Sequence, residues 1–203
     1  MHISHTMTLS PFFVIVAIIV TTGYAQICAV KDTSLDCRNR NLSTVPSFAN
    51  IPDTITHLDF SFNNIKTVNK FNISLSSSIV EISFAHNIIT TIQKGVFDNF
   101  TKLEHLDLSY NKISKDSIKD EDLDFEIGRA KRLTLQGNDL GSLEDLTFVP
   151  FYFLKLEYLD LSYCSLKSLQ DMSIINLGNL KFLNLSYNFL SDFDEGFYQE
   201  KWA

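Results

Sequence analysis

One eleven-residue pattern recurs along most of the chain and constrains its fold more than any other feature. Its clearest copy is LEHLDLSYNKI at 103–113, with apolar residues at the first, fourth, sixth and eleventh positions and Asn111 at the ninth. Five more copies follow the same plan, at 55–65, 79–89, 130–140, 156–166 and 180–190. The fourth position falls at 58, 82, 106, 133, 159 and 183, so the steps are 24, 24, 27, 26 and 24 residues. This period predicts similar units stacked side by side.

The residue types within one copy predict its local structure. Alternating apolar residues such as Leu106 and Leu108 indicate a short strand with one buried face. Because one unit cannot bury that face alone, neighbouring strands are expected to line up about 4.8 Å apart in a parallel sheet. A buried amide must be hydrogen-bonded, so the ninth positions are expected to form a ladder: Asn63, Asn87, Asn111, Asn138, Cys164 and Asn188.

This pattern is similar to the leucine-rich repeat. The stretch at 35–65 resembles the cysteine-flanked cap and first repeat of extracellular leucine-rich-repeat proteins. The stretch at 89–113 resembles the repeats of Toll-family receptor ectodomains, chaoptin-like adhesion proteins and Slit. The resemblance implies an α/β-type repeat solenoid, a leucine-rich-repeat horseshoe. Its concave side is a parallel β-sheet, and its convex side consists of loops and short helical turns.

Three parts are expected along the chain: a signal peptide at 1–25, an N-terminal cysteine-containing cap at 26–54, and about six repeats at 55–203. The first part has an apolar run at 12–20 and small residues at 23 and 25. The run is shorter than the roughly 20 residues of a membrane span, and no later segment approaches that length. The alternative is a retained signal anchor, because the segment before the run carries no Lys or Arg. In an exported chain, the pair Cys28 and Cys37 predicts a disulfide.

Charge and motif content exclude several function classes. A net charge of −7 without a basic cluster argues against binding nucleic acid or anionic lipid. The common catalytic and nucleotide-binding motifs are absent, so we expect neither an enzyme nor a cofactor.

The variable strand positions face the concave side and form the candidate binding surface. The expected ligand-binding residues are His57, His105, Tyr110, Arg132, Tyr158, Tyr163, Phe182 and Tyr187. Exposed aromatic residues beside fixed charges are typical of recognition surfaces. The alternative is that these residue types are simply typical of the repeat and do not indicate a binding surface. A zinc site formed by His57, Glu81 and His105 is a further possibility. We do not favour it, because side chains from three separate strands of a flat sheet rarely reach one metal ion in tetrahedral geometry.

Other residues carry simpler expectations. The four N-glycosylation sequons are at Asn41, Asn72, Asn99 and Asn184, and a glycan on Asn184 would shield the concave face. Cys164 occupies a ladder position, which predicts a buried thiol, with a reactive or pairing thiol as the alternative. The insert at 114–129 favours a solvated short helix over a calcium loop, because Phe125 and Lys131 stand where such a loop needs Gly and Glu.

These observations predict a secreted or cell-surface protein that binds a protein or glycoconjugate ligand through its concave face, as in innate immunity or cell-surface signalling. The alternatives are an adhesive or extracellular-matrix structural protein, or a fragment of a larger membrane receptor. No cysteine follows Cys164, so no C-terminal disulfide cap is expected. We therefore expect a piece or short isoform of a longer repeat protein, or a dimer through the open C-terminal end, with residues 198–202 folding back as a lid as the remaining alternative.

Overall fold

The computed structural model describes residues 27–48, 51–71, 73, 76–114, 129–141, 155–167 and 178–191. Several predictions lie outside these residues: the signal peptide at 1–25, the sequon at Asn72, most of the charged insert, and the end of the chain beyond 191.

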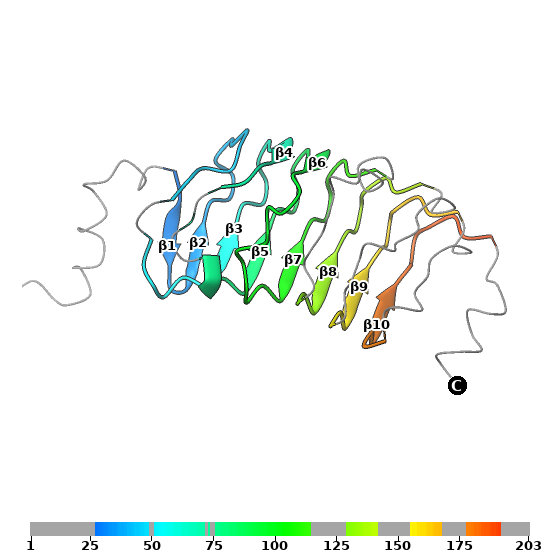
Figure 1. Cartoon of the computed structure of the whole chain (residues 1–203). Coiled ribbons are helices and arrows are strands. Elements are labelled where there is room, and N and C mark those ends of the chain that lie inside the picture. The colour runs from blue at the N-terminus through cyan, green and yellow to red at the C-terminus, as the bar shows by residue number, and fades with distance from the viewer. Residues whose placement is uncertain are drawn as a thin grey trace, which may run out of the picture.

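An eight-stranded sheet runs the length of the described structure (Figure 1). Its strands are β1 (Ala29–Lys31), β2 (Ser34–Asp36), β3 (His57–Asp59), β5 (Glu81–Ser83), β7 (His105–Asp107), β8 (Arg132–Thr134), β9 (Tyr158–Asp160) and β10 (Phe182–Asn184). Strands β1 and β2 form an antiparallel hairpin, and every later strand pairs in parallel with the one before it. The sheet order follows the chain order, which confirms the predicted solenoid.

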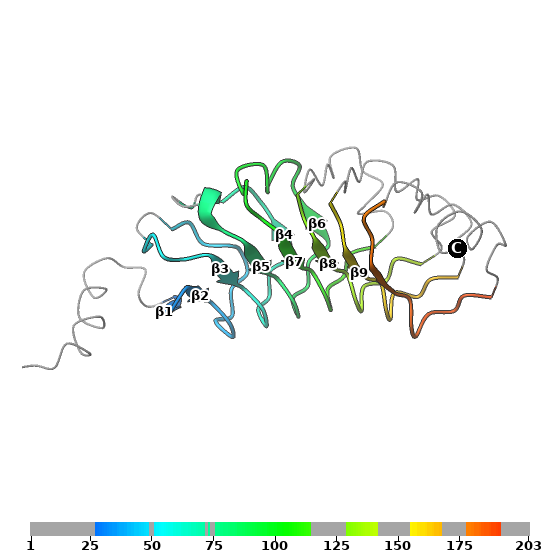
Figure 2. The same cartoon turned by 90° about the horizontal axis from the view of Figure 1, so that it is seen from below.

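The pairing is in register, so equivalent repeat positions lie side by side. Leu58 pairs with Ile82, Ile82 with Leu106, and Leu106 with Leu133. Each of these side chains is at most 1% exposed, so the core is a column behind the sheet. Phe60 and Phe84 are fully buried and stack with ring centres 5.2 Å apart. Seen from below, the molecule is a curved rod with the strands side by side (Figure 2).

The ninth-position amides link each repeat to the one before it. Asn111 Nδ2 donates to Phe84 O at 2.9 Å and to Leu108 O at 3.0 Å, and Asn111 Oδ1 accepts from Ile89 N at 3.0 Å. Phe84 O also accepts from Asn87 Nδ2 at 3.0 Å, so two successive amides share one carbonyl. At Cys164 the thiol replaces the asparagine amide as the donor, and its Sγ donates to Leu135 O at 3.3 Å. These bonds satisfy backbone groups that would otherwise be buried unpaired.

The N-terminal cap extends the sheet by one hairpin. A disulfide joins Cys28 and Cys37, both of which are buried, and confirms the predicted pair. Asp36 on β2 is buried, and its carboxylate accepts hydrogen bonds from the Arg38 guanidinium and from Lys31 Nζ. The Arg38 guanidinium holds the pKa of Asp36 well below its usual range. The cap is therefore fixed covalently and by a compact set of ion pairs.

The structure contains a second, smaller sheet that the sequence did not predict. Strands β4 (Thr67–Val68) and β6 (Thr91–Ile92) pair in parallel, away from the main sheet, where we expected loops and short helical turns. The four residues are all β-branched, which favours extended backbone. Helical structure among the described connecting segments is limited to the 3-10 turn Ser76–Ser78 and other short turns.

Candidate functional site

The outward positions of the strands form a continuous surface, called here the sheet face. Its first row consists of His57, Glu81, His105, Arg132, Tyr158 and Phe182, which pair in register from strand to strand. Its second row consists of Asp59, Ser83, Asp107, Thr134, Asp160 and Asn184. The main chain of the strands holds both rows, so the side chains are fixed on a rigid base.

In the N-terminal half of the first row, the Glu81 carboxylate lies between two histidines. Glu81 Oε2 lies 3.7 Å from His57 Nε2 and 3.6 Å from His105 Nδ1, and each side chain is close to half exposed. Thr56 Oγ1 lies 2.8 Å from His57 Nδ1. Among the described residues, no group of three or more His, Cys, Asp or Glu side chains is arranged to hold a metal ion.

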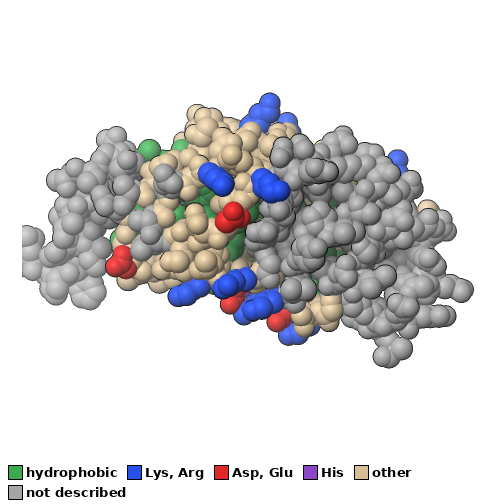
Figure 3. All heavy atoms as spheres, in the orientation of Figure 1, with side chains coloured by type: hydrophobic (Ala, Val, Ile, Leu, Met, Phe, Trp, Pro, Cys, Tyr) green, Lys and Arg blue, Asp and Glu red, His purple; other side chains and the backbone are tan. Residues whose placement is uncertain are grey.

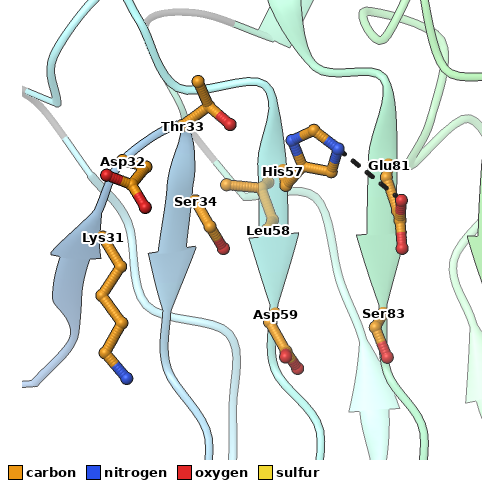
Figure 4. Close-up of a pocket in the computed structure, with 9 residues that line it drawn as sticks. All are labelled: Lys31, Asp32, Thr33, Ser34, His57, Leu58, Asp59, Glu81 and Ser83. Atoms are coloured by element: carbon orange, nitrogen blue, oxygen red, sulfur yellow. Dashed lines mark ion pairs between the residues drawn. The ribbon is translucent and has the colours of Figure 1, made fainter.

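A hollow lies where the cap meets His57 and Glu81 (Figure 4). It has a volume of ≈ 320 Å³ and is lined by Lys31, Asp32, Thr33, Ser34, His57, Leu58, Asp59, Glu81 and Ser83. Figure 4 shows His57 and Glu81 pointing toward one another across β3 and β5. Its lining carries both signs of charge and hydroxyl groups, so it suits polar contacts.

The C-terminal half of the first row is a stack of planar groups. The Arg132 guanidinium carbon lies 4.0 Å from the Tyr158 ring centre, and the Tyr158 and Phe182 rings stack 4.5 Å apart at an interplanar angle of 6°. Tyr158 O–H donates to Asp160 Oδ2 at 3.4 Å. Burial and the nearby Asp160 carboxylate raise the pKa of Tyr158, so its hydroxyl stays protonated at neutral pH.

The second row has a structural role that the sequence interpretation missed. Asp59, Asp107 and Asp160 each accept, through Oδ1, the backbone N–H of the serine two residues later, at 2.9 to 3.0 Å. Asn184 does the same for Ser186 at 3.1 Å. These bonds form Asx turns that bend the chain out of β3, β7, β9 and β10. The recurrent Asp-x-Ser spacing was the available signal.

A third row lies just beyond the C-terminal ends of the strands and is called here the rim. Its members are Phe62, His86, Tyr110, Gly137, Tyr163 and Tyr187, and all have positive φ, between 52° and 71°. Phe62, His86 and Tyr110 form one stack with ring centres 4.3 and 4.4 Å apart, and Tyr163 and Tyr187 form another at 4.2 Å. The predicted binding residues are therefore divided: Tyr110, Tyr163 and Tyr187 are on the rim, and the other five are on the sheet face.

The rim is the feature that sequence reasoning described least completely. Bulky side chains rarely adopt positive φ, which costs of the order of 1 kcal/mol per residue. Here the stacked rings offset part of that cost. Phe62 and His86 were not among the predicted binding residues, although both are more than a third exposed. Gly137 in the same register was the one sequence signal for the backbone conformation of this row.

Paired charges border the opposite edge of the sheet. Lys131 Nζ lies 2.9 Å from Glu104 Oε1, and Lys181 Nζ lies 2.8 Å from Glu157 Oε2. These residues immediately precede β7, β8, β9 and β10, and their signs alternate from one repeat to the next. From β7 to β10, the first row is thus bounded by ion pairs on one side and by the second row on the other.

The remaining predicted residues occupy three different environments. Asn41 and Asn99 are exposed, whereas Asn184 is half-buried on the sheet face. Cys164 is fully buried, and burial raises the pKa of its thiol to about 12. In the view of Figure 3, Lys and Arg side chains are scattered over the visible described surface.

Models of one protein family match several separate parts of the chain. The models described as leucine rich repeat cover residues 53–68, 77–117, 155–177 and 179–199. These matched segments contain strands β3 to β7, β9 and β10, together with the ladder residues Asn63, Asn87, Asn111 and Asn188. The chain belongs to the leucine-rich-repeat family. A solved structure titled "Crystal structure of TLR13-ssRNA13 complex" has the same fold, with a TM-score of 0.63 and 24% identity over 83% of this chain and 24% of that one.

Curated relatives of this leucine-rich-repeat protein include three that are each 30% identical. They are osteomodulin of Rattus norvegicus (81% of this chain, 37% of the relative), Tsukushi of Xenopus tropicalis (76% and 56%) and oligodendrocyte-myelin glycoprotein of Homo sapiens (87% and 45%). The chain thus spans between about a third and just over half of their length. These relatives are extracellular and non-enzymatic. No helix in the described residues has both the length and the apolar character that a bilayer crossing needs.

Proposed function

We propose that this leucine-rich-repeat protein works outside the cell and binds a protein or glycoconjugate ligand through its sheet face, in recognition or cell-surface signalling. The observation that carries the proposal is the first row of the sheet face. Six strands present, in register, a Glu81 carboxylate between His57 and His105, followed by a stack of Arg132, Tyr158 and Phe182.

The physical argument rests on rigidity and composition. A partner that docks on side chains fixed by a sheet orders fewer groups on binding than one that docks on loops. Arg, Tyr and Phe are also enriched at the energetic centres of protein interfaces. The extracellular relatives support the same location for this chain.

A glycan placed on the sheet face tests the proposal directly. Glu81→Asn creates the sequon Asn-Ile-Ser at 81–83, in the middle of the first row. The matched control is Lys112→Asn, which creates Asn-Ile-Ser at 112–114, at an exposed position outside both rows of the sheet face. Both proteins would be secreted from cultured cells, checked for the added glycan by mass spectrometry, and applied to arrays of extracellular proteins and of glycans.

The proposal expects that every ligand bound by the wild-type chain is lost with the glycan at residue 81 and kept with the glycan at residue 112. Ligands that survive the glycan at residue 81 would contradict it. Beads coated with the wild-type chain provide a test of the adhesive alternative. Clustering of those beads with one another, without any array ligand, would favour an adhesive or matrix role.

A further inference from the structure

Arg132 differs from four other basic residues of the sheet and its borders, Lys31, Arg38, Lys131 and Lys181. Lys31 and Arg38 pair with Asp36, and Lys131 and Lys181 pair with glutamates at 2.9 and 2.8 Å. The Arg132 side chain is exposed, and within the described part of the chain no carboxylate lies at ion-pair distance from it. Its guanidinium therefore presents N–H donors to solvent from the middle of the sheet face.

The guanidinium is nevertheless held in place. One face of the Tyr158 ring supports it at 4.0 Å, and Phe182 stacks on Tyr158 at 4.5 Å. The Tyr158 hydroxyl is tied to Asp160, whose carboxylate also accepts hydrogen bonds from Ser162 and from Asn184 Nδ2. Stacking on an aromatic ring is a setting in which arginine, with its planar fork of donors, is favoured over lysine. The fork is thus positioned before any partner arrives.

The surrounding charges select the kind of anion. Thr134, two residues after Arg132 on β8, pairs in register with Asp107 on β7 and with Asp160 on β9. Glu81 lies one strand beyond His105 in the first row. These carboxylates repel a polyanion such as a sulfated glycan, which needs several basic groups in a row. A single carboxylate can still pair with the fork in a bidentate way.

We propose that Arg132 is the anchor for one Asp or Glu side chain of a protein partner, flanked on that partner by an apolar or aromatic residue that packs on Phe182. This inference rests on the proposed function of the sheet face and names the class of its ligand. Phe182 is 47% exposed, so its ring offers apolar area directly beside the arginine stack. Together the two contacts recognise a short acidic-aromatic element.

A displayed library of random twelve-residue peptides provides a defined probe. The secreted wild-type protein is used for selection, and synthetic versions of the enriched peptides are measured by fluorescence anisotropy. The variants are Arg132→Gln, which removes the charge, and Arg132→Lys, which keeps the charge and removes the fork. Lys112→Gln is the matched control, because Lys112 is an exposed cation outside the sheet face. Thermal unfolding of each variant checks that it is folded.

The expected result has five parts. Enriched peptides carry an Asp or Glu beside an apolar residue, Arg132→Gln weakens their binding at least tenfold, and Lys112→Gln leaves it unchanged. Replacing the peptide's acidic residue by its amide weakens binding to the wild-type protein but causes no further loss with Arg132→Gln. Arg132→Lys recovers only part of the affinity.

Three results would overturn the inference. The inference is wrong if the enriched peptides lack an acidic residue. It is also wrong if they bind the Arg132→Gln variant as tightly as they bind the wild type. If those peptides still fail to bind the Glu81→Asn glycan variant, the proposed function of the sheet face stands, but Arg132 is not its anchor. Tighter binding of a heparin oligosaccharide than of the peptides, lost with Arg132→Gln, would assign the arginine to a sulfated glycan instead.

Discussion

The side-chain amide nitrogen of Asn184 donates a hydrogen bond to Asp160 Oδ2 across the last two described strands, at 3.1 Å. Asn184 Oδ1 meanwhile accepts from the Ser186 hydroxyl at 2.7 Å and from Ser186 N at 3.1 Å. Asn184 is thus engaged on the sheet face with the carboxylate that also holds Tyr158.

This arrangement predicts unequal use of the sequons. Asn41 and Asn99 are exposed and are expected to carry glycans in protein from secreting cells, whereas Asn184 is expected to be largely unmodified. A glycan on Asn184 would stand over the Tyr158 stack and obstruct a partner. Enzymatic glycan release in heavy-oxygen water, followed by peptide mass spectrometry, measures occupancy at each site. Full occupancy at Asn184 would exclude this part of the sheet face as a working surface.

The amide ladder predicts a large stability effect from one buried asparagine. Asn111→Ala leaves the buried Ile89 N–H without its acceptor, and we expect a loss of about 2–3 kcal/mol in the free energy of unfolding. The control is Asn64→Ala, because Asn64 is exposed and, within the described part of the chain, its side chain donates one hydrogen bond, to the exposed Asn41 side chain. That change is expected to cost less than about 0.5 kcal/mol. Urea unfolding compares the two, and equal losses would refute the ladder's role.

Two glycines with the same backbone conformation test the rim. Gly137 has φ of +71°, and a Cβ there would lie 2.6 Å from Tyr110 Cδ1; Gly141 has φ of +63° and nothing within 4 Å. Gly141→Ala should cost only the backbone strain, about 1 kcal/mol. Gly137→Ala should cost more, because the Tyr110 ring must move. The extra loss of stability in Gly137→Ala, relative to Gly141→Ala, should disappear when Tyr110 is also replaced by Ala. Thermal unfolding of the two glycine variants, each with and without Tyr110→Ala, measures this. An extra loss that persists with Tyr110→Ala would place its cause elsewhere.

Asp36 predicts how the cap responds to acid. Its carboxyl has a pKa below its usual range in the folded chain, so the folded state loses this proton more readily than the unfolded state does. The stabilisation is therefore complete above the unfolded pKa of about 4 and declines as the pH falls below it. Asp36→Asn should cost about 1–3 kcal/mol at pH 7 and flatten the decline between pH 4 and 2. Unfolding curves at several pH values test this, and parallel pH profiles for the two proteins would contradict it.

Much of the fold could be predicted because the repeat determines it locally. The spacing of Leu106, Leu108 and Asn111 gives the strand, the buried face and the turn in one motif. Because such units stack in chain order, the strands of the sheet are expected in the same order as in the sequence. The small sheet of β4 and β6 was missed, because two-residue strands carry too few positions to establish a period.

The candidate site was only partly predictable. Strand periodicity correctly places His57, His105, Arg132, Tyr158 and Phe182 on one face. It could not separate Tyr110 from that face, because the separation depends on a positive φ that follows from the turn beyond the strand. Nor could it show that Glu81 bridges two histidines, since that requires rotamers on three neighbouring strands.

The central claim, that the sheet face binds the partner, is tested most directly by measuring the dissociation constant of one array ligand against two sets of alanine variants. The working set is Tyr158→Ala on the sheet face with Tyr110→Ala and Tyr163→Ala on the adjoining rim, and the reference set is Lys94→Ala and Lys167→Ala, away from both. We predict that Tyr158→Ala weakens binding by about 1–2 kcal/mol, or roughly 5- to 30-fold, that the rim variants also weaken it, and that the reference set leaves it unchanged. An equal or larger loss from Lys94→Ala or Lys167→Ala would contradict the account.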